Sequence, residues 1–485
     1  MKFPVLSVII FSPLIGSLVI AMMKNNQERI IRWIAVVATA VPLVLAVVVL
    51  ANFDPGHGVQ FVEKISWSKT IGASYYLGVD GISLPMLMLS ALLGLIAVIA
   101  SWSIKLKVKG YYALLLLLMV GILGVFLALD YIMFYIFWEL VLLPMYFLIG
   151  IWGGDKREYA AIKFFLYTLA GSVIMLLAIL AVYFRGGANT FDILALATKG
   201  FPAGFQNIIF WGFFAGFAVK VPIVPFHTWL PDAHTEAPTA ISVLLAGVLL
   251  KMGTYGFIRV IIPTTPLALQ KFSGVLAALA VISIIYGALN AMIQKDLKRM
   301  IAYSSISHMG YVILGISAMT AIGVNGAIMQ MFSHGLITAM LFLLVGYIYE
   351  RTHTRSIPEL GGLLNVVPLL AGALCFASFA SLGLPGLSGF VAEFLVLLGS
   401  FPVMKVMTAI ASTGVVITAG YLLWMLQRVV MGDVPEKLKE LKDATPRELI
   451  TLAPLVLLIV GVGIYPESVL GMVNQSVMTL MKALS

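Results

Sequence analysis

Apolar runs of about 20 residues recur along the whole 485-residue chain, and each is long enough to cross a bilayer as a helix. A transmembrane barrel would instead show short segments of alternating polarity. Charged residues make up only 11% of the sequence, whereas about a quarter of a soluble domain is charged. The pattern therefore predicts an all-α membrane protein and excludes a soluble enzyme.

The apolar runs predict about fourteen transmembrane helices. The first run follows a single lysine and lacks a small-residue cleavage site, so we interpret it as a span and not as a signal peptide. The expected spans are residues 4–23, 30–49, 82–103, 111–128, 131–150, 160–184, 206–225, 238–260, 272–292, 300–320, 323–348, 366–400, 406–430 and 449–471. Their connections alternate between the two sides of the membrane.

Basic residues divide unequally between these two sides, with nineteen on one and nine on the other. The richer side carries Lys24, Arg29, Arg32, Lys105, Lys107, Lys109, Lys156, Arg157, Lys163, Lys295, Lys298, Arg299, Arg351, Arg355, Arg428, Lys437, Lys439, Lys442 and Arg447. The poorer side carries Lys2, Lys64, Lys69, Arg185, Lys199, Arg259, Lys271, Lys405 and Lys482. Because Lys and Arg collect on the cytoplasmic side, both termini are predicted to face outward. The net charge of +9 then reflects topology and not nucleic-acid binding.

Six of the ionisable residues within the expected spans are candidates for function, because a charge at the centre of a membrane helix costs roughly 2.5–3.5 kcal/mol on insertion scales. They are Glu139, Lys220, Lys251, His308, His334 and Glu393. A single pair of Glu139 with a lysine could act only as a staple between helices. Two carboxylates, two lysines and two histidines over six spans instead favour a water-bridged row of groups that exchange protons.

Two expected spans contain helix breakers. Span seven runs into Pro222-Ile223-Val224-Pro225, where proline removes backbone hydrogen bonds. Span twelve is too long for one straight crossing and contains the glycine-rich stretch 383–389. Matching broken helices in two opposed units predict an inverted repeat with an ion path between the halves. The expected divisions are 1–105 (spans one to three), 106–262 (first five-helix repeat), 263–430 (inverted second repeat) and 431–485 (a loop and span fourteen).

The sequence offers little that could hold a metal or a redox cofactor. Four polar residues follow span seven: His227, Asp232, His234 and Glu236. Their spacing suits a metal poorly, and a polar cytoplasmic mouth that feeds protons inward is the better interpretation. Haem ligation by His308 and His334 is a weaker alternative, because their spans show no other haem feature. The single cysteine, Cys375, excludes an all-cysteine iron–sulfur cluster within the chain. We expect no cofactor and no metal.

Three motifs together resemble a known family. They are Phe137–Tyr146 (FWELVLLPMY), Lys220–Pro238 (KVPIVPFHTWLPDAHTEAP) and Asp296–His308, which contains Ala302-Tyr303-Ser304-Ser305. This set is similar to the antiporter-like membrane subunits of respiratory complex I, the proton-pumping NADH:quinone oxidoreductase. The resemblance covers essentially the whole chain and includes the expected number of spans.

Within that family the chain most resembles subunit M, the chain 4 type. Subunit L is similar but carries a long C-terminal lateral helix, whereas this chain stops soon after span fourteen. Subunit N and the sodium/proton antiporter subunits usually have lysine where this chain has Glu393. The stretch Gly78–Ser83 before span three also resembles the M type.

The resemblance implies a role for each buried ionisable residue. Glu139 would pair with Lys220 and set how tightly that lysine holds a proton. Lys251 would be the central relay, with His308 and His334 beside it. Glu393 would pass protons to the outer side. The chain would thus be one pump channel of a larger enzyme, driven by electron transfer in other subunits.

The implied partners are membrane lipid and the other antiporter-like subunits, of the L and N types, with the lateral helix of subunit L along the flank. The implied location is the bacterial inner (plasma) membrane, with a thylakoid membrane as the alternative. Two further interpretations stay open at this point. The chain could instead belong to a multisubunit cation/proton antiporter or to a proton-pumping membrane hydrogenase.

The distribution of basic residues generates a topological prediction. A reporter that is active only outside the cytoplasm, fused after Ser485, should be active in intact cells, because the C-terminus is expected on the outer face. A cytoplasm-specific reporter at the same position should be silent. Activity of the cytoplasmic reporter alone would contradict the fourteen-span topology.

Overall fold

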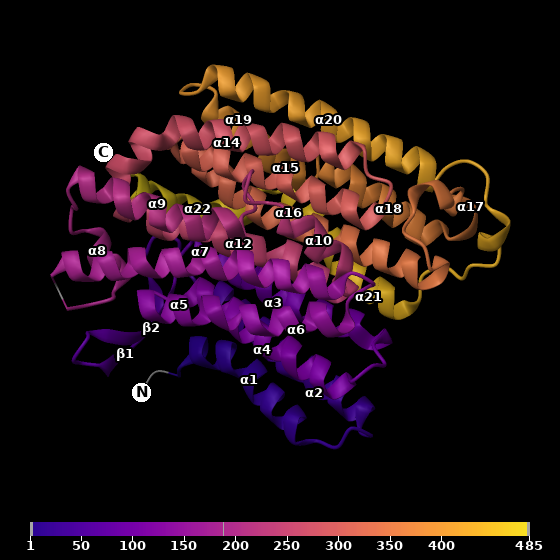
Figure 1. Ribbon diagram of the computed structural model, residues 1–485, viewed down its shortest axis with the longest axis horizontal. Coiled ribbons are helices and arrows are strands. Elements are labelled where there is room, and N and C mark those ends of the chain that lie inside the picture. Colours follow the sequence, from indigo (N-terminus) through magenta and orange to yellow (C-terminus); the bar gives the residue numbers. More distant parts are fainter. Residues whose placement is uncertain (1–2, 188, 483–485) are drawn as a thin grey trace. The chain divides into compact units, whose positions relative to one another are not determined.

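The computed structural model describes residues 3–187 and 189–482, and Figure 1 shows that nearly all elements are helices. Within this part, twelve helical stretches are long and apolar enough to cross a membrane. The all-α membrane class predicted from the sequence is therefore confirmed. Two more expected spans are present as α9 and as the pair α18 and α19, which are described below.

The spanning stretches follow the expected order along the chain. They are α1 (Val5–Met22), α2 (Glu28–Ala51), α3 (Ser83–Ala100), α4 (Val108–Leu127), α5 (Tyr131–Leu140) with α6 (Leu142–Trp152), α7 (Arg157–Gly186), α11 (Thr239–Leu244) to α13 (Ile262–Thr264), α14 (Pro266–Met292), α15 (Leu297–Ser317), α16 (Ala321–Thr352), α20 (Lys405–Val429) and α21 (Pro446–Ile464). Short elements connect them: η1 (Ser101–Ser103), α8 (Ile193–Ala197), η4 (Ile357–Glu359), α17 (Leu363–Val366) and η5 (Glu436–Leu438).

The described chain forms two compact units. Unit 1 contains the chain up to Val221, then Val248–Gly274 and the chain from Gly471 onward; unit 2 contains Pro222–Gly247 and Val275–Leu470. Two of the four boundaries between the units fall at the break after span seven and within span eight, and the other two fall within α14 and within the helix Glu467–Lys482. The repeat boundaries proposed from the sequence stay a prediction.

Both breaks predicted in the spans are confirmed. After span seven, α9 (Ala203–Lys220) in unit 1 ends two residues before Pro222, and α10 (Trp229–Glu236) in unit 2 begins beyond Pro225. In unit 2, α18 (Pro368–Ser381) and α19 (Ser388–Ser400) are separated by a turn in which Gly383 and Gly386 have φ values of +84° and +90°. Glycine adopts this left-handed conformation without steric cost, so the turn can interrupt the span.

Span eight is interrupted in a second way. Two π-helical stretches, η2 (Leu245–Leu249) and η3 (Phe257–Ile261), flank α12 (Leu250–Gly256). In a π-helix each backbone hydrogen bond joins residues five apart instead of the four of an α-helix, which rotates the side chains that follow. Such stretches are frequent at functional sites. The alternation of apolar residues along the sequence gave no sign of them.

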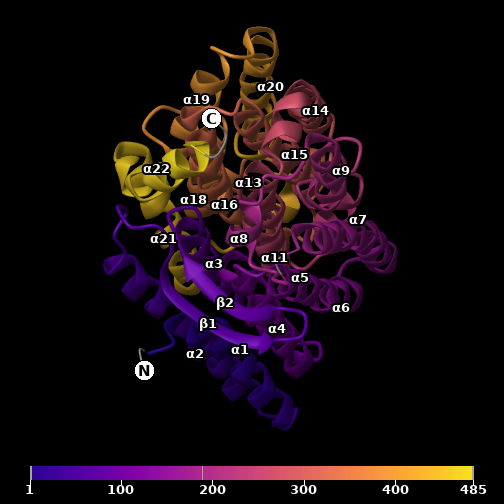
Figure 2. The ribbon, with the colours of Figure 1, turned by 90° about the vertical axis from the view of Figure 1, so that its left-hand side faces the viewer.

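Two elements were not predicted from the sequence. The expected loop between spans two and three contains a hairpin of β1 (Gln60–Ser68) and β2 (Ala73–Val79), seen as paired arrows in Figure 2. After span fourteen, α22 (Glu467–Lys482) buries Val469, Val473 and Val477 on one face. That spacing of four residues is typical of an amphipathic helix that lies against other elements.

Glycine brings the helices that carry the ionisable residues close together. In unit 1, α7 and α9 meet where Gly212 faces Ala178 and Gly216 faces Met175. In unit 2, α16 and α19 meet where Gly323 and Gly399 pack backbone against backbone. Small residues allow such close approach in a membrane, where there is no hydrophobic force between helices.

Candidate functional site

Glu139 and Lys220 are both in unit 1 and are held by two different helices. The carboxylate of Asp130 accepts hydrogen bonds from the backbone N–H groups of Ile132 and Met133 and so caps the first turn of α5, which carries Glu139. Lys220 is the last residue of α9 and is 2% exposed. Glu139 lies within the apolar spanning stretch Tyr131–Trp152, whereas Lys220 ends a helix of 18 residues that is not among the twelve spanning stretches.

Aromatic rings surround the Lys220 ammonium group. Its Nζ atom lies 5.4 Å from the centre of the Trp138 ring and 5.6 Å from that of Phe164. An ammonium ion over an aromatic face gains a cation–π attraction, which is stronger where water is excluded. Trp138 directly precedes Glu139, so the same turn of α5 supplies both the ring and the carboxylate that face this lysine.

The charge on Glu139 acts on Lys220 through space. The Tyr135 hydroxyl, one turn earlier on α5, interacts with the carboxylate of Glu139 and with Ser172. The Oε1 atom of Glu139 is buried and accepts no hydrogen bond. A buried carboxylate oxygen without a donor is costly, so this atom is poised to accept a donor such as a water molecule or a proton.

Lys251 lies in the same unit, fully buried on α12. A methyl group placed on Gly253 would lie 3.1 Å from Cβ of Lys220 and 2.9 Å from the carbonyl oxygen of Phe217. The absence of a side chain at Gly253 therefore lets α12 approach the end of α9 closely. The two lysines predicted to relay protons thus lie on helices in direct contact.

His308, His334 and Glu393 come together in unit 2. The Nδ1 atom of His308 lies 2.7 Å from Oε1 of Glu393, and both side chains are buried. The Nε2 atom of Gln330 donates to the same carboxylate oxygen at 3.3 Å. The second ring nitrogen of His308, Nε2, is 3.2 Å from the hydroxyl of Ser381. The histidine is therefore held on both ring nitrogens.

A small cavity joins these groups. It has a volume of about 10 Å³, close to the space that one water molecule needs. Its lining includes His308, Gln330, His334 and Glu393, and the two imidazole rings are 5.6 Å apart between centres. The broken helix α18–α19 contributes to this arrangement because Ser381 ends α18 and Glu393 lies on α19. The structure brings together three ionisable residues that the sequence analysis singled out, and it adds Gln330 and Ser381, which the sequence analysis did not name.

The polar residues after span seven do not form a single cluster of side chains. Asp232 pairs with Arg299 at 3.1 Å, whereas the ring of His234 stacks on Phe342 with 4.6 Å between centres. The Lys298 ammonium donates to the carbonyl oxygen of Ala237, just beyond α10. Among the described residues, no three His, Cys, Asp or Glu side chains are placed to hold a metal ion. The segment after span seven is therefore a polar part of unit 2 that contacts the basic side chains of Arg299 and Lys298.

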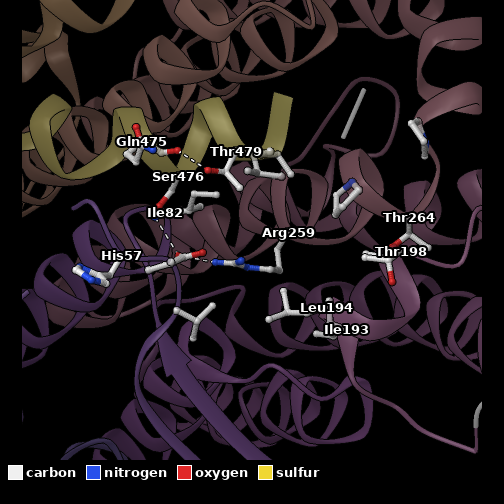
Figure 3. Close-up of a pocket in the computed structure, with 18 of the residues that line it drawn as sticks. His57, Ile82, Ile193, Leu194, Thr198, Arg259, Thr264, Gln475, Ser476 and Thr479 are labelled. Carbon is white, nitrogen blue, oxygen red and sulfur yellow. Dashed lines mark hydrogen bonds and ion pairs between the residues drawn. The ribbon is translucent and has the colours of Figure 1, made fainter. Parts of the chain in front are cut away.

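One buried charge pair was missed by the sequence analysis. Asp80 and Arg259 form an ion pair of 2.6 Å in unit 1, and both side chains are buried. Figure 3 shows Arg259 within a pocket, opposite Ser476 and Thr479. In the sequence analysis Arg259 counts only as a basic residue of the outer side, and Asp80 is only part of the stretch Gly78–Ser83. A charge expected one residue before the end of a span carries no signal that it is buried.

The fold and these groups define a class: a polytopic membrane protein whose buried acids, lysines and histidines lie beside broken helices, as in ion-translocating proteins. The family described as NADH:quinone oxidoreductase/Mrp antiporter matches residues 128–418, and that described as NADH-ubiquinone oxidoreductase chain 4, amino terminus, matches residues 7–130. The chain belongs to the NADH:quinone oxidoreductase/Mrp antiporter family and, within it, to the subunit M or chain 4 type.

Individual relatives agree with this assignment. The chain is 45% identical to NADH-quinone oxidoreductase subunit M of Rhodobacter capsulatus, over 98% of this chain and 96% of that one. A chain of respiratory complex I from Thermus thermophilus is 29% identical, with a TM-score of 0.92 and full coverage of both chains. A chain of the Mrp complex from Dietzia has a TM-score of 0.85 at 20% identity over the whole of both chains, which shows the fold alone. The resemblance inferred from the sequence motifs is confirmed.

The His308–Glu393 pair generates a prediction. Glu393→Gln removes the charge opposite His308 but keeps the size of the side chain, so we expect assembly with proton translocation reduced about tenfold or more. Glu393→Asp keeps the charge and should retain more of the activity. Proton uptake by inverted membrane vesicles, measured beside NADH oxidation, checks this. Equal pumping by wild type and Glu393→Gln would contradict it.

Proposed function

We propose that this chain, a membrane subunit of an NADH-quinone oxidoreductase, carries protons across the membrane along six ionisable residues of its helices. Electron transfer in other subunits would supply the energy. In unit 1 the carriers are Glu139, Lys220 and Lys251; in unit 2 they are His308, His334 and Glu393. We expect no cofactor or metal in the chain itself.

The observation that carries the proposal is the environment of Lys220. Burial disfavours a charged ammonium group, whereas a nearby carboxylate favours it. Lys220 is almost fully buried, is electrostatically coupled to Glu139 and ends its helix two residues before Pro222. A small movement at this helix end would change the separation of the two charges and hence the number of protons that Lys220 holds. A pump stroke requires this property.

The groups in unit 2 suit a second stage of transfer. His308 contacts Glu393 on one ring nitrogen and Ser381 on the other, so a proton can enter at one nitrogen and leave from the other. Both His308 and Glu393 line the small cavity, which has space for a water carrier. We propose that Glu393 passes protons toward the outer side.

Partners and orientation complete the proposal. Subunits of the L and N types would be neighbours in the membrane, with the lateral helix of subunit L along the flank and lipid around the rest. The membrane would be the bacterial inner membrane, with both termini facing outward. The excess of basic residues on one side supports this orientation.

The Glu139–Lys220 pair gives the decisive test. Glu139→Gln keeps the shape but removes the charge that favours protonated Lys220. We expect the complex to assemble normally, to lose nearly all pumping and to lose coupled electron transfer with it. Glu139→Asp is the matched control, because its charge survives one methylene shorter, and it should keep much of both activities.

Blue-native gels and proton uptake by vesicles separate this relay from a purely structural pair. A structural staple predicts the opposite pattern, in which Glu139→Gln damages assembly while the complexes that do assemble pump normally. Fully assembled Glu139→Gln complex with wild-type pumping would contradict both interpretations of the pair.

A further inference from the structure

Gln330 lies in the unit 2 site but takes no part in the relay proposed above. It belongs to α16 and is 2% exposed. Its Nε2 atom donates to Oε1 of Glu393 at 3.3 Å, and the same carboxylate oxygen lies 2.7 Å from Nδ1 of His308. Side chains of two different helices, α15 and α16, therefore contact the Glu393 carboxylate at one oxygen.

The orientation of the Gln330 amide follows from this contact. An ionised carboxylate only accepts hydrogen bonds, so the NH2 end of the amide faces Glu393 and its oxygen, Oε1, is turned away. This oxygen is buried and accepts no hydrogen bond from any residue that the structure describes. A buried acceptor without a donor is costly. We therefore expect a donor for Oε1 that is not a protein side chain.

The cavity of about 10 Å³ offers space for such a donor. Gln330 and His334 are four residues apart on α16 and both line it, together with Glu393 of α19. Ile337 and Ala380 supply apolar parts of the wall. A buried water needs about this volume and roughly two to four polar partners. The site therefore admits one water molecule and no larger group.

A staple between helices is the competing interpretation of Gln330. The packing of α16 on α19, however, already rests on glycine: Gly323 packs against Gly399, and Gly326 lies against the backbone of Val396. A staple also needs only the NH2 end of the amide and would leave the buried Oε1 atom without a donor. The unpaired oxygen and the cavity that Gln330 lines therefore favour a role in holding water.

An amide suits this role because it cannot carry the transferred proton itself. It donates through nitrogen and accepts through oxygen without gaining or losing a charge. Gln330 can therefore hold a carboxylate at one end and a water molecule at the other, while the proton moves between groups that ionise. Histidine and glutamate are such groups, and both are present in the cavity wall as His334 and Glu393.

We propose that Gln330 is a positioning residue that holds one water molecule in the cavity, aligned between His334 and Glu393. This inference rests on the proposed relay function. Protonated His334 gives its proton to this water, and the water passes one of its own protons to the Glu393 carboxylate. His334 is then neutral, Glu393 is protonated and the water again has two hydrogens. The step runs toward Glu393, in the direction of the relay.

Ordered water in a structure of the assembled complex tests the site directly. Electron cryo-microscopy at a resolution that shows single water molecules should reveal one in the cavity, about 2.7–3.2 Å from Oε1 of Gln330. In the Gln330→Met variant this water should be lost, while the contact between His308 and Glu393 stays. A wild-type cavity without water overturns the proposal.

Pumping by the same variant tests the transfer step. Methionine keeps an unbranched side chain of similar length but has no amide group. We expect assembled Gln330→Met complex to translocate fewer protons per electron than the wild type in sealed vesicles. Ser333→Ala is the matched control, because it also removes a buried polar contact between α16 and α19, from Oγ of Ser333 to the Ser388 carbonyl oxygen at 3.2 Å. Ser333 does not line the cavity, so this variant should pump like the wild type.

A second variant keeps the proposal testable when Gln330→Met does not assemble. Ala380→Val adds two methyl groups to the cavity wall, so it should exclude the water and lower pumping although Gln330, His334 and Glu393 remain. Wild-type pumping by assembled Gln330→Met, or by assembled Ala380→Val whose cavity holds no water, overturns the proposal. When Glu393→Gln lowers pumping in the same assay, that result overturns the water site alone; when Glu393→Gln also pumps normally, the relay itself is wrong.

Discussion

A charge cannot be hydrated in hydrocarbon, and the arrangement of this chain depends on that constraint. Each buried ionisable group must find a partner inside the protein or change its protonation state. Lys220 is placed between aromatic rings and near a carboxylate, and His308 contacts Glu393. The same constraint gives these groups their value for proton transport, because a small change in a partner's position changes which form is stable.

Interruptions of regular helix structure occur beside these groups in both units. Lys220 ends α9 at a proline-containing break, and Lys251 lies between two π-helical stretches. Glu393 lies five residues beyond the start of α19, after the glycine turn. Helix ends in a membrane are tolerated where they line polar cavities or are buried in protein. Regular helical backbone therefore ends or changes beside the groups proposed to transfer protons.

Much of this could be predicted from the sequence. Length and polarity indicated the spans, proline and glycine indicated both breaks, and the cost of a buried charge drew attention to the six residues proposed as the relay. Other features depend on distant partners and leave no local pattern. Arg259 resembles any loop arginine until Asp80, 179 positions away in the sequence, is found beside it. Gln330 and Ser381 are ordinary polar residues, and the hairpin and α22 lie outside the apolar runs.

The central claim is that protons pass through the buried groups of this chain, and Lys251 tests it most directly. Lys251→Met keeps an unbranched side chain of similar length but cannot hold a proton. Proton uptake and NADH oxidation should be measured together in sealed vesicles that contain fully assembled complex. The account predicts that pumping by this variant is nearly abolished and that coupled electron transfer falls with it. An unchanged number of protons per electron would contradict the account.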